Sequence, residues 1–136
     1  MNFSYPYTAT QQQPGGFFVR FVDIEEGITE GDTLEDAAFN AAEVLTGVLA
    51  YRLEKGQDIP APSESAGRPV ALPSAAVQAV MILREARGGS IADLARGLGT
   101  SWAAAQRLDD PHHWPSLKQL DRAARVLGRR LVLRLE

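Results

Sequence analysis

Six carboxylate side chains lie close together in the first third of the chain. They are Asp23, Glu25, Glu26, Asp32, Glu35 and Asp36. Carboxylates catalyse metal-assisted hydrolysis when several of them converge on one ion from different structural elements. Most of these six belong to one loop and to the start of one helix, where capping and solvation account for acidic residues. We therefore expect no catalytic residue among them.

The two histidines, His112 and His113, are adjacent in the segment DDPHHWP. A structural zinc site needs a tetrahedral set of ligands, and two neighbouring histidines without a matched third ligand supply it poorly. The nearby Asp109 and Asp110 leave a weak metal site as the alternative, but the segment favours a turn between helices. The chain has no cysteine, so disulfides and thiolate metal sites are excluded and a cytoplasmic location is expected. We expect neither a metal nor another cofactor.

A third stretch, SIADLARGLGTSWAAAQRL over residues 90–108, has the spacing of two short helices joined by a tight turn. Ser90 is a good N-cap, and Gly99 permits the left-handed backbone that ends a helix. Thr100 or Ser101 then caps the second helix. The expected inward residues are Ile91, Leu94, Ala95 and Leu98, followed by Ala104, Ala105 and Leu108. This is helix-turn-helix spacing, which presents the second helix to a DNA major groove.

Further helices are expected on both sides, before Gly88 and after Ser116, the latter with Leu117, Leu120, Ala123, Ala124 and Leu127 buried. The run LREARGGSIADLARGLGTSWAAAQRLDDP, with SLKQLDRAARVLG after it, resembles the Xre/Cro-like repressor domain. By position, this resemblance implies DNA contacts by Thr100, Ser101, Trp102, Ala103, Gln106 and Arg107.

Among these residues, the forked side chain of Arg107 suits guanine or phosphate, and Gln106 suits adenine. The hydroxyls of Thr100 and Ser101 suit phosphate. The sequence departs from the repressor pattern at Ile91, Trp102 and Ala103, where that family often carries glutamine. Trp102 either packs on sugar edges and thymine methyls or belongs to the core.

The net charge of −3 conceals an asymmetry between the two halves of the chain. Residues 1–72 hold 11 acidic and 4 basic side chains, a balance of −7. Residues 73–136 hold 6 acidic and 10 basic side chains, a balance of +4. The basic half suits a phosphate backbone, whereas the acidic half repels nucleic acid and suits a basic protein partner. The two halves are therefore expected to have different partners.

The first half reads as a sheet followed by a long helix. Alternating residues predict strands over 2–10 and 17–23, joined by a Pro-Gly-Gly turn, and a short third strand at Ile28-Thr29. A helix capped by Thr33 follows and ends near Gly56, with Leu34, Ala38, Ala41, Leu45, Val48 and Leu49 facing the sheet. Residues 56–72 read as a linker with one short strand near 68–72, expected to be sensitive to proteases, and the domain boundary is placed near residue 73.

The run GGFFVRFVDIEEGITEGDTLEDAAFNAAEVL resembles the HicB-type antitoxins. The residues that carry this resemblance are Gly16, Phe21, Asp23, Gly27, Thr29, Gly31, Asp32, Thr33, Leu34, Glu35, Ala37, Asn40 and Ala41. The resemblance implies a partial ribonuclease-H-like fold that covers a basic HicA-type ribonuclease toxin, and a second half that binds operator DNA. On this interpretation, residues 1–72 bind the toxin through Asp23, Glu25, Glu26, Asp32 and Glu35.

The last eight residues, RRLVLRLE, alternate in the manner of a strand. Leu131, Leu133 and Leu135 share one face, and Val132 lies on the other. A lone terminal strand has to pair its backbone groups, and a second copy of the chain supplies a partner. We expect a homodimer joined through these four residues, or a tetramer if an edge of the first-half sheet also self-associates. Arg129 and Arg130 are either a phosphate anchor or the flank of this strand.

Together these patterns predict an α+β chain, with an α/β module over 1–72 and an all-α helix-turn-helix domain with a terminal strand over 73–136. The resemblance to HicB-type antitoxins implies that the first module is partly ribonuclease-H-like. No apolar run approaches the roughly 20 residues of a membrane span. The predicted function is that of a non-catalytic antitoxin that represses its own operon. The alternative is a stand-alone repressor whose first half senses a ligand or mediates oligomerisation.

Overall fold

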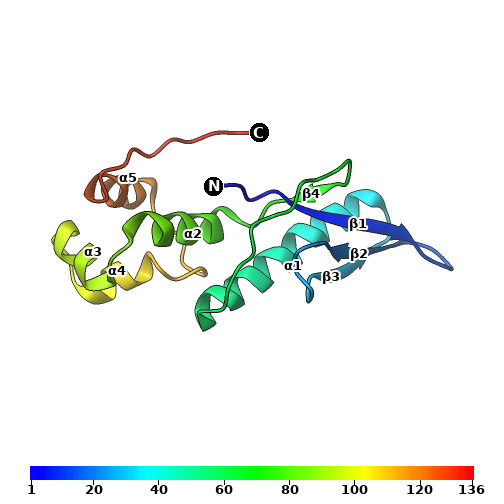
Figure 1. The fold of residues 1–136 in the computed structure, drawn as a ribbon, viewed down its shortest axis with the longest axis horizontal. Helices are drawn as coiled ribbons and strands as arrows, with labels where there is room; N and C mark the ends of the chain where they lie inside the picture. The colour runs from blue at the N-terminus through cyan, green and yellow to red at the C-terminus, as the bar shows by residue number, and fades with distance from the viewer. The chain divides into compact units, whose positions relative to one another are not determined.

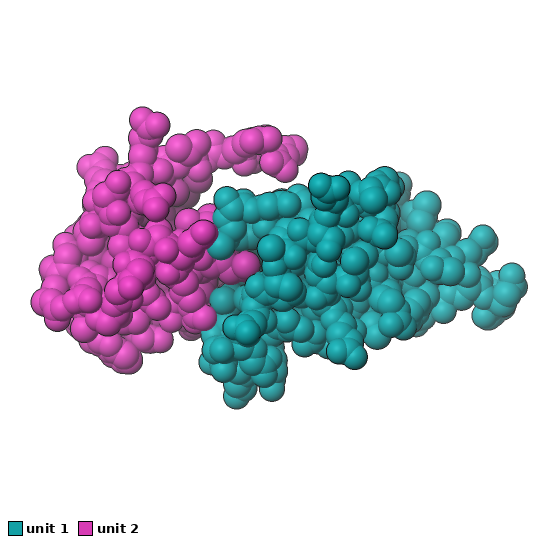
Figure 2. Space-filling model, viewed as in Figure 1, with its two compact units in different colours: residues 1–77 teal, residues 78–136 magenta.

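The computed structural model describes residues 1–136 and shows a mixed α+β architecture, as predicted (Figure 1). In chain order the elements are β1 (Tyr5–Gln11), β2 (Phe17–Phe21), β3 (Ile28–Gly31), α1 (Leu34–Lys55), β4 (Val70–Ala71), α2 (Ala75–Arg87), α3 (Ile91–Leu98), α4 (Trp102–Arg107) and α5 (Leu117–Val126). The chain divides inside α2 into two compact units, Met1–Val77 (unit 1) and Gln78–Glu136 (unit 2) (Figure 2). Residues 73–77 carry no charge, so the balances of −7 and +4 hold for these units too.

Unit 1 is built on a sheet of strand order β3-β2-β1-β4, in which every neighbouring pair is antiparallel. The predicted strands are present, including the short one after the linker. The buried residues of β1 are the consecutive Tyr5, Pro6 and Tyr7, and those of β2 are the alternate Val19 and Phe21. The rings of Tyr7 and Phe21 pack with centroids 5.6 Å apart. This buried face packs against α1 (Figure 1).

Helix α1 begins after Thr33, whose hydroxyl accepts a hydrogen bond from the backbone N–H of Asp36, and it ends at a left-handed Gly56. Its buried residues are Ala37, Ala41, Leu45, Leu49, Ala50 and Leu53. The predicted face was wrong at Leu34 and Ala38, which are exposed, and Val48 is half-buried. The reason is a close approach between β3 and the helix. It is seen at Gly31, where an added Cβ would lie only 2.4 Å from the backbone nitrogen of Ala37. That contact turns residue 37 toward the sheet.

The segment 56–69 has no helix or strand, as expected of a linker, but it is tied to the rest of unit 1. The hydroxyl of Tyr5 donates to the carbonyl of Pro60 at 2.7 Å. The Arg52 guanidinium donates to the carbonyl of Asp58 at 3.0 Å, and the backbone N–H of Ser63 donates to the Asp23 carboxylate at 2.8 Å. These bonds hold the segment along unit 1.

Unit 2 contains the remaining helices around a small core of Leu83, Leu94, Leu108 and Ala123. Helices α3 and α5 approach each other closely at Gly97, where an added Cβ would lie only 2.4 Å from Cγ1 of Val126. The predicted burial of Leu117 was wrong, since this side chain is 60% exposed. It lies in the first turn of α5, beyond the part of the helix that contacts the core.

The terminal strand was predicted to form by pairing with a second copy, and within the single chain residues 129–136 form no strand. A strand has to satisfy its backbone groups by pairing, and the sheet of this chain consists only of β1 to β4. Leu131 is half-buried, whereas Val132, Leu133 and Leu135 are 73%, 65% and 100% exposed. None of the helices is both long enough and apolar enough to cross a membrane.

Candidate functional site

Two of the acidic residues predicted to bind a partner are bonded to other residues of unit 1. Asp23 accepts hydrogen bonds from both the backbone N–H and the hydroxyl of Ser63. Glu26 forms an ion pair with Arg52, with 2.6 Å between the nearest atoms. The hydrogen bond from the Arg52 side chain holds the pKa of Glu26 below its ordinary value. Both carboxylates therefore fasten loops of this unit.

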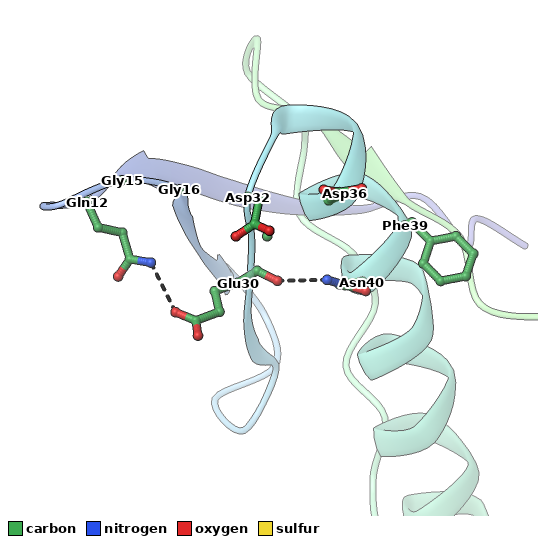
Figure 3. Close-up of a pocket in the computed structure, with 9 residues that line it drawn as sticks. Gln12, Gly15, Gly16, Glu30, Asp32, Asp36, Phe39 and Asn40 are labelled. Carbon is green, nitrogen blue, oxygen red and sulfur yellow. Dashed lines mark hydrogen bonds between the residues drawn. The ribbon is translucent and has the colours of Figure 1, made fainter.

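The remaining predicted acidic residues, Glu25, Asp32 and Glu35, are exposed and make no ion pair. Asp32 lies on an open pocket of about 330 Å³ (Figure 3). The pocket is lined by Gln12, Gly15, Gly16, Glu30, Gly31, Asp32, Asp36, Phe39 and Asn40. Asp36, like Asp32, makes no ion pair. The pocket therefore presents uncompensated negative charge to the solvent.

The walls of this pocket are fixed by two hydrogen bonds to Glu30 (Figure 3). The Gln12 amide donates to the carboxylate of Glu30 at 3.0 Å, and the Asn40 amide donates to its backbone carbonyl at 2.8 Å. At the rim, Phe39 is 67% exposed. An aromatic ring beside carboxylates suits a cationic side chain, which is attracted both by the negative charge and by the ring face. Sequence reasoning missed Phe39, although its place opposite Ala37 and Ala41 on a helix was a signal for exposure.

The structure does not assemble the acidic residues into a metal centre. No group of three or more His, Cys, Asp or Glu side chains is arranged to hold an ion. The histidine segment forms the predicted turn, in which Asp110 accepts hydrogen bonds from the backbone N–H groups of His112 and His113 at 2.9 and 3.1 Å.

The second candidate surface lies on the two short helices of unit 2. Ser90 and Asp93 form a reciprocal capping box at the start of α3, and Gly99 ends that helix in the left-handed conformation. Ser101 then caps α4 by accepting from the N–H of Ala104. Ala105 is buried on the inner side of α4. These local signals fix the turn and leave the opposite side of α4 open to solvent.

All six residues predicted to contact DNA lie on the turn or on α4. Five are exposed, namely Thr100, Ser101, Trp102, Ala103 and Arg107, and Gln106 is half-buried. Trp102 is 58% exposed, so it does not belong to the core. The structure thus brings these residues together as one outward surface.

The basic residues of unit 2 fall into two sets. Arg84 and Arg87 pair with Asp109 at 2.7 and 3.2 Å. Other ion pairs join Arg96 to Asp93, Arg125 to Asp121, and Arg134 to Glu136. The basic residues without an ion pair are Arg107, Lys118, Arg122, Arg129 and Arg130, all of which are exposed. Sequence reasoning missed Lys118 and Arg122, although their spacing of four residues on α5 places them on one helix face.

A family comparison identifies the class of protein that this fold belongs to. Residues 4–77, which include the whole of unit 1 apart from its first three residues, match the family described as HicB_like antitoxin of bacterial toxin-antitoxin system. The chain belongs to this family, as the sequence motifs predicted.

The resemblance extends beyond the matched region to the full chain. Antitoxin HicB of Escherichia coli strain K12 is 32% identical, over 95% of this chain and 96% of that protein. Antitoxin HicB of Pseudomonas fluorescens strain Pf0-1 is 32% identical, over 92% and 89%. Antitoxin HicB 1 of Photorhabdus laumondii is 28% identical, over 99% and 88%. These relatives support an antitoxin role in a toxin-antitoxin system.

Proposed function

We propose that this chain is the antitoxin of a HicA–HicB pair. Its N-terminal domain, residues 1–72, neutralises a HicA-type ribonuclease toxin. Its C-terminal domain, residues 73–136, binds operator DNA and so represses the operon that encodes the pair. The observation that carries the proposal is the opposite charge of the two parts, −7 and +4, within a chain of the HicB-like family. A surface of each sign attracts a different kind of partner.

On the toxin side, the acidic residues have two separate roles. Glu25, Asp32 and Glu35 are free to attract a basic surface, and Asp36 and Phe39 extend the contact around the pocket. Asp23 and Glu26 act indirectly, because their partners Ser63 and Arg52 belong to the same unit. Exposed charges mainly accelerate association and select the partner, while the apolar ring adds contact area.

On the DNA side, α3 and α4 act as a helix-turn-helix, with α4 in the major groove. Arg107 contacts guanine or phosphate, and Gln106 contacts adenine. The exposure of Trp102 supports a contact with sugar edges or thymine methyls. Thr100 and Ser101 position the helix on the backbone.

The terminal residues 131–135 join two chains into a dimer. The exposed side chains of Val132, Leu133 and Leu135 and the unpaired backbone of this segment favour pairing with the same segment of a second copy. Two copies of α4 would then read half-sites roughly 34 Å apart. A tetramer forms if the edge strands β3 or β4 pair as well.

A non-catalytic role is part of the proposal. Incubation of the purified chain with labelled RNA and Mg²⁺ or Mn²⁺ tests it, and RNA cleavage that co-purifies with the chain contradicts it. A cytoplasmic location is also part of the proposal, and the absence of cysteine supports it.

Co-expression tests the proposal as a whole. The expected result is that a small basic protein encoded beside this chain arrests growth alone, that the chain restores growth, and that the two co-purify. The alternative is a stand-alone repressor that senses a ligand. The unit 1 pocket, at about 330 Å³, falls within the roughly 300–1,000 Å³ of small-molecule sites, but its lining is mostly polar, whereas such sites are mostly apolar. The absence of such a neighbour, or its failure to co-purify, supports this alternative.

A further inference from the structure

Arg122 is a basic residue of unit 2 that has no acidic partner within the chain. It lies in the middle of α5 and makes no ion pair, whereas Arg125, three residues later, pairs with Asp121 at 3.2 Å. Arg122 instead lines a small cleft with residues of the α3–α4 turn and of α4. An unneutralised arginine in a cleft is free to bind an anion from outside the chain.

The cleft is held in place by packing between helices. The close approach of Gly97 to Val126 fixes α5 against α3, just before the turn that leads into α4. The cleft has a volume of about 110 Å³ and is lined by Leu98, Thr100, Ala104, Leu108, Gln119 and Arg122. Its polar members come from two elements that are distant in the sequence.

All three polar side chains can donate hydrogen bonds. Gln119 is oriented by its capping role, because its Oε1 accepts from the backbone N–H of Ser116 at 2.8 Å and its Nε2 is left to donate. Thr100 supplies a hydroxyl, and Arg122 supplies a forked guanidinium that matches two oxygens of one phosphate. No carboxylate lines the cleft. A phosphate group is bound by hydrogen-bond donors and a positive charge, and this cleft offers both without a competing carboxylate.

The size of the cleft and its place narrow the choice of ligand. At about 110 Å³ it is smaller than the roughly 300 Å³ of ordinary small-molecule sites, so it suits a single group at the edge of a larger ligand. It shares Thr100 with the surface proposed to meet DNA. We propose that Thr100, Gln119 and Arg122 form a phosphate seat, which grips one backbone phosphate of the duplex beside the groove occupied by α4. This inference rests on the proposed DNA-binding function.

The test is the salt dependence of binding between the full chain and a labelled duplex from its own promoter, followed by fluorescence anisotropy. Each phosphate contact contributes about 0.9 to the slope of log K against log salt. Arg122→Gln is therefore expected to lower that slope by about one per bound chain. The same variant should weaken binding to an unrelated duplex by the same factor, since a phosphate carries no sequence information.

Arg125→Gln is the matched control, because it removes the same charge from the same helix but from an arginine already paired with Asp121. It should leave the slope unchanged. Arg122→Lys keeps the charge and should retain most of the slope, which separates loss of the contact from loss of the fold.

Three outcomes overturn a claim. If the unaltered chain binds no promoter duplex, the proposed DNA-binding function fails, and the phosphate seat with it. If it binds but Arg122→Gln keeps the full slope, only the seat is refuted. If Arg122→Gln weakens binding to the promoter but not to unrelated DNA, Arg122 reads a base and the seat is again refuted.

Discussion

Gly31 is the position at which the fold of unit 1 tolerates least change. A Cβ added there would lie 2.4 Å from the backbone nitrogen of Ala37, 2.8 Å from its Cα and 2.8 Å from the backbone carbon of Asp36. All three are main-chain atoms, so no side chain can rotate away, and β3 and α1 have to move apart. Gly31→Ala is therefore expected to destabilise unit 1 by about 1–3 kcal/mol, the usual cost of overpacking a core.

The chain carries its own probes for this experiment. The three tyrosines, Tyr5, Tyr7 and Tyr51, all lie in unit 1, whereas both tryptophans, Trp102 and Trp114, lie in unit 2. Near-ultraviolet circular dichroism of tyrosine thus reports unit 1, and tryptophan fluorescence reports unit 2. For a unit of this size, each kcal/mol shifts Tm by about 4–8 °C, so the tyrosine transition should fall by roughly 4–24 °C. The tryptophan transition should stay in place.

Gly47→Ala is the matched control, since Gly47 lies in the middle of α1 and a Cβ added there would have no neighbouring atom within 4 Å. Alanine favours a helix over glycine by about 1 kcal/mol, so this variant should raise the tyrosine transition. A Gly31→Ala protein whose tyrosine transition matches that of the unaltered chain would refute the close approach between β3 and α1.

Four further predictions address other parts of the chain. Deletion of residues 129–136 should give monomers with weak promoter binding, and a truncated chain that still sediments as a dimer refutes the terminal interface. Asp109→Ala leaves two arginines without their shared carboxylate, so the tryptophan transition in urea should show a loss of about 1–3 kcal/mol, and an unchanged midpoint contradicts this. The lowered pKa of Glu26 adds stability that is present above its unfolded-state pKa and lost as the pH falls through its folded-state pKa. Arg52→Gln should therefore make the free energy of unfolding of unit 1 depend less on pH in the acid range. Identical pH profiles for the variant and the unaltered chain contradict this. Trp102→Ala should weaken promoter binding while the stability changes by less than about 0.5 kcal/mol, because the ring is mostly exposed, and a large loss of stability argues for a core role.

The sequence predicted those features that depend on local chemistry. The caps at Thr33 and Ser90 accept hydrogen bonds as expected, and Ser101 is the cap among the two candidates, because a cap is decided within four residues. The strands of the first half were predictable from alternation and from the turn residues between them.

Features that depend on how one element packs against another were not predictable in the same way. The face of α1 was set by the approach of Gly31 to Ala37, which helical periodicity does not contain. Periodicity likewise could not show that the Asp23 carboxylate accepts a hydrogen bond from Ser63, forty residues away, and is therefore not free to bind a partner. The cleft around Arg122 depends on the packing of α5 beside the α3–α4 turn, and a linear pattern shows only an exposed cation there.

The central claim is that the two oppositely charged parts of the chain bind different partners. The most direct measurement scores growth rescue against the neighbouring toxin and promoter affinity, side by side, for two charge variants of the full chain. We expect the double variant Asp32→Lys with Glu35→Lys to lose rescue and keep promoter binding, and Arg107→Gln to keep rescue and lose promoter binding. If either variant loses both activities while remaining folded, or if neither loses any, the division of function between the two parts is contradicted.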